Sequence, residues 1–238
     1  MSAAAKDYGR ETLEVLEGFD AYAGWIYKRI KPYLGQRVME IGSGIGNNVN
    51  HLLSTAESKV MLADYRQDYV DTLTAKHGSN PNVSVHLWDA TTPAPPELAA
   101  EPPDTVVLLN VLEHIKEDRL ALKNIHGLLP AGGRLVVLVP AHQALYSAID
   151  RNLEHHLRYN KAQLTERFTT AGYEVSESFY FNAVGALGWF VAGRVLRAEQ
   201  INGGHVGLQK LLFPVSKAVD ALKPPFGLSV VCVGRKPA

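Results

Sequence analysis

The fold of this chain is limited above all by a short apolar run that ends in a glycine-rich turn. Residues 38–41 read Val-Met-Glu-Ile, the pattern of a buried strand, and glycines follow at Gly42, Gly44 and Gly46. Glycine tolerates positive φ and lets the backbone come close to a ligand, and the helix expected after the turn offers unpaired N–H groups. This order of strand, glycine turn and helix predicts a ligand cradle in an α/β fold.

The glycine spacing separates this cradle from two common phosphate-binding loops. The dinucleotide pattern G-x-G-x-x-G needs its third glycine at position 47, which is Asn47, and a phosphate loop needs a Lys-Ser or Lys-Thr pair that is missing here. Glu40 would repel a pyrophosphate but suits a ligand with ammonium and sulfonium charges. The run E-x-G-x-G-x-G resembles the first motif of class I S-adenosylmethionine-dependent methyltransferases, which implies S-adenosyl-L-methionine as the cofactor.

Strand and helix patterns alternate from about residue 37 to residue 180, which is typical of βαβ units and a parallel sheet. Seven strands are expected, at 38–41, 60–63, 83–87, 105–109, 134–139, 174–179 and 229–234. Helices are expected at 47–53, 69–77, 119–128 and 161–169. We therefore predict an α/β, Rossmann-like, doubly wound seven-stranded sheet that is mostly parallel and has an antiparallel last strand.

The length of 238 residues suits one α/β domain, so 1–238 is expected to form a single methyltransferase domain. Its expected parts are a helical N-terminal cap, the core, an apolar helical insertion and the last strand, at 1–35, 36–181, 182–227 and 228–238. Neither a signal peptide pattern near the N-terminus nor a continuous apolar stretch of about 18 residues occurs, so a cytoplasmic location is expected.

Composition limits the classes of partner. The 24 basic and 24 acidic residues cancel, so no net charge draws the chain to nucleic acid or to an anionic membrane. A nucleic-acid methyltransferase is also disfavoured because no Asn-Pro-Pro-Tyr-like tetrad follows the fourth strand. The expected partner is a small-molecule acceptor. The single cysteine, Cys232, lies in an apolar run and is expected in the core.

The apolar run 183–197 gives two alternatives for a further partner. Trp189 and Phe190 beside Arg194 and Arg197 suit peripheral contact with a membrane surface or a cover over a lipid-like substrate. The other interpretation is a helical insertion that packs on the sheet edge or against a second subunit, which would make a homodimer.

Further cofactor contacts are expected where later strands end. Asp64 ends the second strand, where an acid can accept hydrogen bonds from ribose hydroxyls, and Asp89 closes the third, where it can accept from the adenine amine. The alternative for either aspartate is a turn or cap. Residues 110–115, Asn-Val-Leu-Glu-His-Ile, resemble the fourth methyltransferase motif. From these residues and from this resemblance, the cofactor is expected to contact Glu40, Gly42, Ser43, Gly44, Gly46, Asp64, Tyr65, Asp89, Ala90, Asn110, Val111 and His114.

The segment 140–159, after the fifth strand, gathers three histidines, one aspartate and two tyrosines at the substrate side of the sheet. It resembles a methyltransferase subgroup whose loop reads H-x-x-L-Y-S-x-x-D-x-x-x-G-H-x-R-R-Y and which often accompanies sugar- or lipid-modifying enzymes. Here Glu154 stands in place of the glycine and Leu157 in place of the first arginine.

His142, His155 and Asp150 are the expected catalytic residues, because an imidazole can remove the acceptor's proton while a carboxylate orients it. The alternative is that these side chains only hydrogen-bond the loop shut. No metal site is predicted, since His155 and His156 are adjacent and no His-x-x-x-His pair occurs in the segment.

These observations favour an S-adenosylmethionine-dependent methyltransferase that acts on a hydroxyl or similar oxygen of a small molecule, such as a natural product, a sugar or a lipid-linked compound. Two alternatives stay open. One is an S-adenosylmethionine-binding enzyme of another reaction type, such as a cyclase, and the other is a non-catalytic cofactor-binding protein that acts through a partner.

Overall fold

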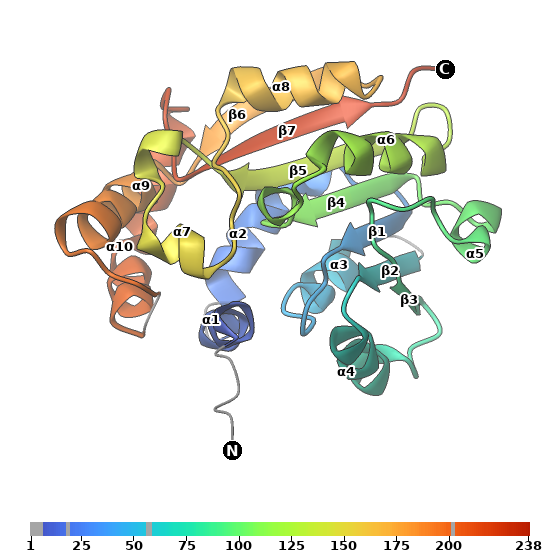
Figure 1. Cartoon of the computed structure of the whole chain (residues 1–238), viewed down its shortest axis with the longest axis horizontal. Coiled ribbons are helices and arrows are strands. Elements are labelled where there is room, and N and C mark those ends of the chain that lie inside the picture. Colours follow the sequence, from blue (N-terminus) through green and yellow to red (C-terminus); the bar gives the residue numbers. More distant parts are fainter. Residues whose placement is uncertain (1–6, 18–19, 56–58, 201–202) are drawn as a thin grey trace.

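The computed structural model describes residues 7–17, 20–55, 59–200 and 203–238. A seven-stranded sheet lies at its centre, in the order β3-β2-β1-β4-β5-β7-β6 (Figure 1). The strands are β1 Arg37–Ile41, β2 Lys59–Asp64, β3 Val83–Leu87, β4 Thr105–Leu109, β5 Arg134–Pro140, β6 Glu174–Phe181 and β7 Ser229–Arg235. All seven expected strands are present, and their ends differ from the expected ones by at most two residues.

The strand directions confirm the expected fold class. β1 pairs in parallel with β2 and β4, and β7 runs antiparallel between β5 and β6. The chain moves outward from β1 to β3 and then returns to β4 on the other side of β1, so the strand order reverses between β1 and β4. In open α/β sheets, ligands bind at this point, outside the carboxyl ends of the strands.

Helices cover both faces of the sheet, which explains why its central strands are apolar on both sides. The helices are α1 Tyr8–Glu17, α2 Asp20–Ile30, α3 Val49–Thr55, α4 Gln67–His77, α5 Pro96–Ala100, α6 Asp118–Leu128, α7 Ala148–Asn152, α8 Lys161–Thr170, α9 Ala183–Phe190 and α10 Gly203–Ala221. Side chains of α6 and α8 fill the core on one face, and those of α2, α3 and α4 fill it on the other.

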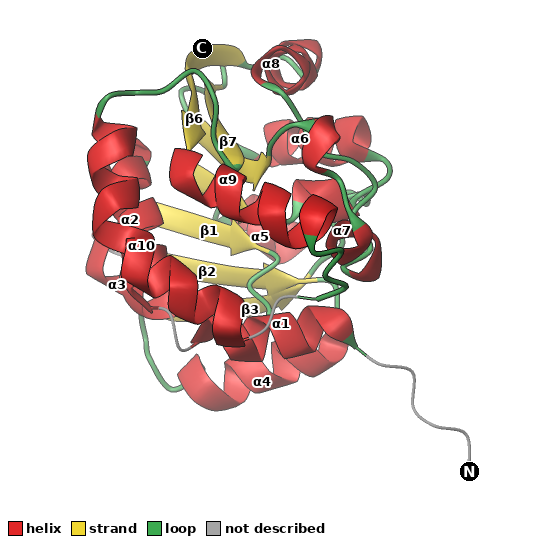
Figure 2. Ribbon diagram, turned by 90° about the vertical axis from the view of Figure 1, so that its left-hand side faces the viewer, coloured by secondary structure: helices red, strands yellow, loops and turns green. Residues whose placement is uncertain are grey.

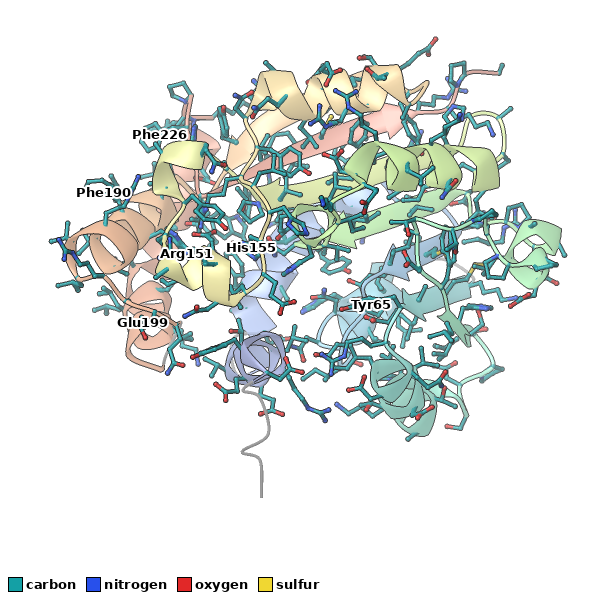
Figure 3. The ribbon with its side chains drawn as sticks, viewed as in Figure 1. Tyr65, Arg151, His155, Phe190, Glu199 and Phe226 are labelled. Atoms are coloured by element: carbon teal, nitrogen blue, oxygen red, sulfur yellow. The ribbon has the colours of Figure 1, made fainter. Side chains whose placement is uncertain are left out.

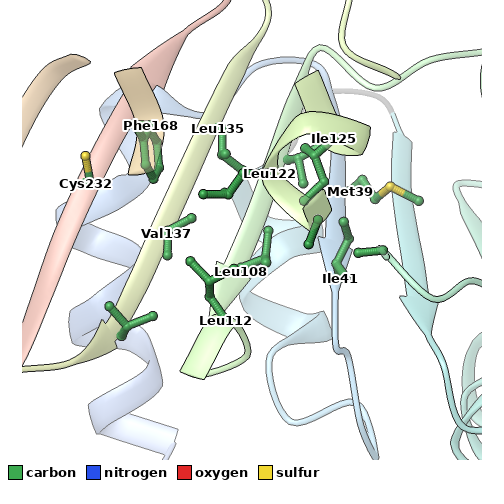
Figure 4. Packing of buried hydrophobic residues seen from close by; sticks show 14 of the residues in the cluster. Met39, Ile41, Leu108, Leu112, Leu122, Ile125, Leu135, Val137, Phe168 and Cys232 are labelled. Carbon is green, nitrogen blue, oxygen red and sulfur yellow. The ribbon is translucent and has the colours of Figure 1, made fainter. Parts of the chain in front are cut away.

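The core on the α6 and α8 face joins residues that are distant in sequence, including Met39, Leu108, Leu122 and Phe168 (Figure 4). Cys232 lies in this cluster, as expected, and burial raises the pKa of its thiol to about 12. A thiol in this environment is a packing residue and is not a nucleophile at neutral pH.

Two segments outside the regular alternation of strands and helices contain helices. The proline-rich stretch 92–103 contains the short helix α5, whose first turn holds Pro96. Proline fits there because the first N–H groups of a helix have no intrahelical partner. The expected insertion is helical and consists of α9, the π-helical turn Val191–Val195 and α10.

The insertion lies at one end of the molecule, where Figure 2 shows α9 and α10 in front of the sheet. α10 packs against α9 and also reaches α1. Within the described ranges no helix combines the length and apolar character that crossing a membrane requires.

Candidate cofactor and acceptor site

The glycine turn after β1 is closely enclosed on two sides. Gly42, Gly44 and Gly46 have φ angles of 75°, 53° and 91°, which disfavour other residues. A methyl group on Gly42 would overlap Cγ2 of Val111, and one on Gly44 would lie 2.9 Å from Cδ1 of Leu13 in α1. The segment after β4 and the helix α1 therefore both approach the turn, and together they surround a backbone cradle.

A buried carboxylate lies beneath this turn. The Oε1 atom of Glu40 accepts hydrogen bonds from the Tyr27 hydroxyl at 3.2 Å and from Nδ2 of Asn48 at 2.8 Å. Its Oε2 atom is buried and has no hydrogen-bond partner among the described residues, and the residue is only 1% exposed. Burial raises the pKa of Glu40 to about 7. An unpartnered carboxylate oxygen at this place fits a cationic ligand group.

Ser43 and Asp64 hold the turn to its neighbours. The Ser43 hydroxyl donates to the Glu40 carbonyl at 3.0 Å, and its N–H donates to the Ala63 carbonyl at 3.1 Å. Asp64 is buried at the end of β2, where its Oδ2 accepts from the Gly44 N–H at 2.9 Å. Desolvation raises the pKa of Asp64. The sequence-predicted acid therefore lies beside the cradle and contacts it directly.

The end of β3 shows the turn role that was the alternative for Asp89. Its Oδ1 accepts from the N–H and the hydroxyl of Thr91, both at 2.8 Å. Ala90 is buried, and its carbonyl accepts from Nδ2 of Asn124 at 2.9 Å. Tyr65, by contrast, is 68% exposed after β2 and leaves its ring accessible (Figure 3).

Asn110 turns the chain away from β4 at the point where the strand order reverses. Its φ of 55° is unusual for a residue with a side chain, and its N–H still donates to the Leu138 carbonyl at 2.8 Å. Val111 follows and packs against Gly42. Backbone strain of this kind concentrates at functional sites, so Asn110 fits its predicted place beside the ligand.

Two of the three expected catalytic residues meet on the acceptor side. Oδ1 of the buried Asp150 lies 3.0 Å from Nδ1 of His155 and accepts from Nε of Arg158 at 2.7 Å. Its Oδ2 accepts from the Ser147 N–H at 2.9 Å and from the Ser147 hydroxyl at 3.1 Å. Burial alone would raise the pKa of Asp150, but the hydrogen bonds from His155 and Arg158 lower it. The carboxylate is therefore ionised and can only accept, so Nδ1 of His155 carries the proton.

His142, the third expected catalytic residue, packs against the sheet. Its ring stacks on Tyr180 of β6 with centroids 4.7 Å apart, and its backbone φ is 63°. Burial, together with the charge of Arg158, lowers the pKa of His142. The Nε2 atom of His142 is buried and has no hydrogen-bond partner among the described residues, so its catalytic role stays a prediction.

Glu113 is a site residue that the sequence did not single out. It is 0% exposed, and neither carboxylate oxygen has a hydrogen-bond partner in the described part of the chain. Oε1 lies 4.0 Å from Nε2 of His155, and burial raises the pKa of Glu113 to about 7. The ring of His114 packs edge-on against that of His155, with centroids 4.7 Å apart. The only sequence signal was an acid next to a histidine after a strand.

The insertion packs against the segment that follows β5. Arg158, which is 1% exposed, lies 4.5 Å from the ring of Trp189 in α9, and Arg194 donates to the Ala144 carbonyl at 2.8 Å. Between the two segments lies a pocket of about 330 Å³, lined by Tyr146, Ser147, Ala148, Arg151, Gly193, Arg194 and Arg197. A second pocket, of about 370 Å³, lies between the 92–103 stretch and α6 and contains none of the predicted site residues.

A match to a protein family decides what this arrangement is. Residues 39–135, which include the glycine turn, both aspartates and the Asn110 segment, match a family described as a methyltransferase domain. The chain carries a class I S-adenosylmethionine-dependent methyltransferase domain. The predicted family and its cofactor, S-adenosyl-L-methionine, are confirmed, whereas the roles of single residues stay predictions.

No curated protein sequence matches the chain. Among solved structures, the [4+2]-cyclase SpnF is similar with a TM-score of 0.61 and 18% identity, over 92% of this chain and 82% of that one. Phosphoethanolamine N-methyltransferase 2 of Haemonchus contortus, solved with S-adenosyl-L-methionine, has a TM-score of 0.61 and 18% identity, over 92% and 53%. The CurJ carbon methyltransferase has a TM-score of 0.57 and 16% identity, over 87% and 50%.

The chain spans about half the length of the last two proteins. At these identities the similarity shows the methyltransferase fold alone. The three proteins are named for different reactions, so the fold does not select the acceptor of this methyltransferase domain.

Proposed function

We propose that this domain transfers a methyl group to a hydroxyl or similar oxygen of a small molecule. The observation that carries the proposal is the Asp150–His155 pair at 3.0 Å. With Nδ1 protonated and bound by the carboxylate, Nε2 is free to accept the acceptor's proton. The acceptor oxygen forms a bond to the methyl carbon, the carbon–sulfur bond breaks, and S-adenosylhomocysteine leaves.

S-adenosyl-L-methionine supplies an activated methyl group, and the residues around the glycine turn fit it. The unpartnered Oε2 of Glu40 suits the ammonium group. The glycines of the turn carry no side chains, so the ligand can approach the backbone closely. Asp64 is the proposed ribose acceptor. Tyr65, Asp89 and Ala90 are proposed for the adenine, and Asn110, Val111 and His114 for the methionine side and the adjoining wall.

The cofactor assignment is tested by calorimetry of S-adenosyl-L-methionine and S-adenosylhomocysteine. Asp64→Ala should weaken binding of both by about 1 to 3 kcal/mol, because polar groups of the ligand lose their acceptor. Asp71→Ala is the control, since Asp71 is an exposed acid in α4 that accepts only from Gln67. Equal affinities for the two variants would remove Asp64 from the cofactor site.

Catalysis is tested by measuring S-adenosylhomocysteine formation with a panel of hydroxylated acceptors. His155→Gln should slow the reaction by about 10²- to 10⁴-fold without changing cofactor affinity, and some activity should remain because alignment alone supplies about 7 to 11 kcal/mol. His156→Gln, at the adjacent exposed histidine, is the matched control and should retain nearly full rate.

The two alternatives give different results in the same assay. A cyclase-like enzyme would convert its substrate and form no S-adenosylhomocysteine. A non-catalytic protein would bind the cofactor, show no turnover, and tolerate substitution of His155 without loss of function.

We also propose that the acceptor is lipid-linked and is taken from the cytoplasmic surface of an anionic membrane. Most of the large apolar side chains that are exposed in the described chain lie in the insertion, namely Leu187, Phe190, Val191, Val195, Leu196, Leu208, Leu211, Val215, Leu222 and Phe226. In the same segment, 182–227, five arginines and lysines outnumber two acids, although the whole chain has no net charge. Apolar contact and attraction of about 1 kcal/mol per basic residue near the surface favour such a membrane.

Vesicle sedimentation tests this contact. The domain should sediment with vesicles of phosphatidylserine and phosphatidylcholine and remain in solution with phosphatidylcholine alone. Leu211→Glu should abolish sedimentation, whereas Leu120→Glu, an equivalent change at an exposed leucine of α6, should not. No sedimentation, together with a dimer in ultracentrifugation that Leu211→Glu dissociates, would assign the face to a second copy of the chain.

A further inference from the structure

Two buried hydrogen-bond acceptors face each other on the acceptor side of the site. Oε1 of Glu113 lies 4.0 Å from Nε2 of His155. Because Asp150 accepts the proton on Nδ1, the Nε2 atom of a neutral His155 presents a lone pair. Both carboxylate oxygens of Glu113 are buried without a partner in the described ranges. Such a pair is unfavourable unless a positive charge lies between the two atoms.

His114 adds a third ligand atom at the same place. One ligand atom each from Glu113, His114 and His155 lies within 4.8 Å of the others. Atoms that bind one ion at about 2.0 to 2.2 Å are about 3 to 4 Å apart, so small side-chain rotations would bring these three into range. His114 is exposed, whereas the other two are buried, so the cluster is open on one side.

We propose that Glu113, His114 and His155 form a binding site for a divalent transition-metal ion of the zinc type. Two imidazoles and one carboxylate are the protein ligands of many catalytic zinc sites, which leave a position for water or substrate. The open side at His114 provides that position.

The surroundings of His155 are those of a metal-binding histidine. Such a histidine usually donates its other ring N–H to a carboxylate, which fixes the tautomer and the ring orientation. Asp150 does this at 3.0 Å and is itself held by Ser147 and Arg158. We assign Asp150 as a positioning residue for the site.

Backbone contacts fix the two segments that supply the ligands. The His156 N–H donates to the Glu113 carbonyl at 2.8 Å, and the Tyr146 hydroxyl donates to the His155 carbonyl at 2.7 Å. The side chain of His156 is exposed and is not part of the three-residue cluster. Of the two adjacent histidines, only His155 belongs to the cluster, so substitution of His156 is a matched control for substitution of His155.

The role of this site in turnover rests on the proposed function, but metal binding itself does not. An acceptor hydroxyl in the open position would bind the ion through its oxygen and release its proton to solvent water more readily, as water does on zinc. With the ion bound, Nε2 would be a ligand, so this route would replace the proton removal by Nε2 that is proposed above for the metal-free protein.

The test is a metal titration of the full chain after treatment with a chelator. Calorimetry should show one equivalent of Zn²⁺ bound, and Co²⁺ should give visible absorption typical of a bound site. Glu113→Gln and His155→Gln should lower Zn²⁺ affinity more than Asp150→Asn, for which a loss of about 10- to 100-fold is expected. His156→Gln should bind Zn²⁺ as the wild type does.

A cooperative thermal transition and the circular dichroism spectrum of the wild type establish that each variant is folded. His114→Gln changes an exposed side chain and serves as the ligand variant if a buried substitution prevents folding. The proposal is overturned if the folded wild type binds no Zn²⁺ or Co²⁺, or if the ligand variants bind as tightly as His156→Gln. In that case a proton, and not a metal ion, lies between Glu113 and His155. If the protein binds Zn²⁺ at this site but transfers no methyl group, the metal site is supported and the proposed function is contradicted.

Discussion

Val111 packs so closely against Gly42 that a methyl group on the glycine would overlap its Cγ2 atom. The two residues lie just after neighbouring strands, β1 and β4, between which the strand order reverses. This contact defines one wall of the cofactor cradle and makes Gly42 intolerant of substitution for two reasons, its φ of 75° and the lack of space.

Gly42→Ala should therefore abolish measurable cofactor binding and destabilise the protein by about 1 to 3 kcal/mol, the cost expected for a strained backbone position. Gly127→Ala is the control, because nothing lies within 4 Å of a methyl group at that helical position. It should stabilise the protein by about 0.5 to 1 kcal/mol. Calorimetry and urea unfolding measure both effects, and normal cofactor affinity in Gly42→Ala would contradict the proposed cradle.

Glu40 gives a prediction with a defined pH dependence. Its pKa of about 7 in the folded protein is above the ordinary 4.5, so the folded state holds the proton more tightly than the unfolded state. Its contribution to stability is therefore lost as the pH rises from about 5 to about 8. Glu40→Gln removes this contribution. Over that pH range the free energy of unfolding should therefore fall less in the variant than in the wild type, by up to about 3 kcal/mol, because one pKa unit corresponds to about 1.36 kcal/mol.

The same variant should lose cofactor affinity, since the ammonium group loses its counter-charge. Urea unfolding at the two pH values and calorimetry measure the two effects. A variant with the pH dependence of the wild type would show that Glu40 is ionised in the folded protein throughout this range.

The place of the candidate cofactor residues in the fold could be predicted from the sequence because they lie near strand ends or just after them. Glu40, Gly42 and Asp64 are marked by local patterns, and the parallel sheet brings strand ends to one edge. The contact between Glu113 and His155 joins segments 42 residues apart, so the tertiary fold alone reveals it. His142 was grouped with His155 because both lie in one short segment, and the stacking of its ring on Tyr180 could not be predicted because Tyr180 lies in a strand that follows later in the chain.

Glu154 also departs from its sequence pattern in a way that the backbone explains. It stands where the similar subgroup has glycine, and its φ is 61°. A side chain in this left-handed conformation costs about 1 to 2 kcal/mol. Glu154→Gly should therefore stabilise the protein by about 0.5 to 1 kcal/mol, since part of the gain is offset by the greater freedom of the unfolded chain.

Urea unfolding measures this change. Glu117→Gly, at an exposed residue with a φ of −89°, is the comparison and should not stabilise the protein. A loss of stability in Glu154→Gly would mean that the Glu154 side chain makes contacts worth more than the backbone strain.

Arg158 balances the buried Asp150 and so supports the acceptor side. Its Nε lies 2.7 Å from Asp150, and both residues are almost fully buried. Arg158→Met should cost about 3 to 5 kcal/mol, because it leaves a buried charge without its partner. Arg167→Met provides the comparison, since Arg167 pairs with Asp118 at 2.8 Å but is partly exposed, and its loss should cost less. Similar costs for the two variants would show that Asp150 is screened by His155 alone.

Trp189 offers a way to separate acceptor binding from cofactor binding. Its ring lies 4.5 Å from the Arg158 guanidinium, while its Nε1–H is buried and has no acceptor within the described chain. A bound acceptor can supply that hydrogen bond, which is worth about 0.5 to 1.5 kcal/mol. Trp189→Phe keeps an aromatic ring over Arg158 and removes only the donor. It should raise the KM for the acceptor by about 2- to 10-fold and leave the affinity for S-adenosyl-L-methionine unchanged, whereas Phe190→Leu, at the exposed neighbouring residue, should change neither. An unchanged acceptor KM in Trp189→Phe, with full activity, would place the acceptor away from the insertion.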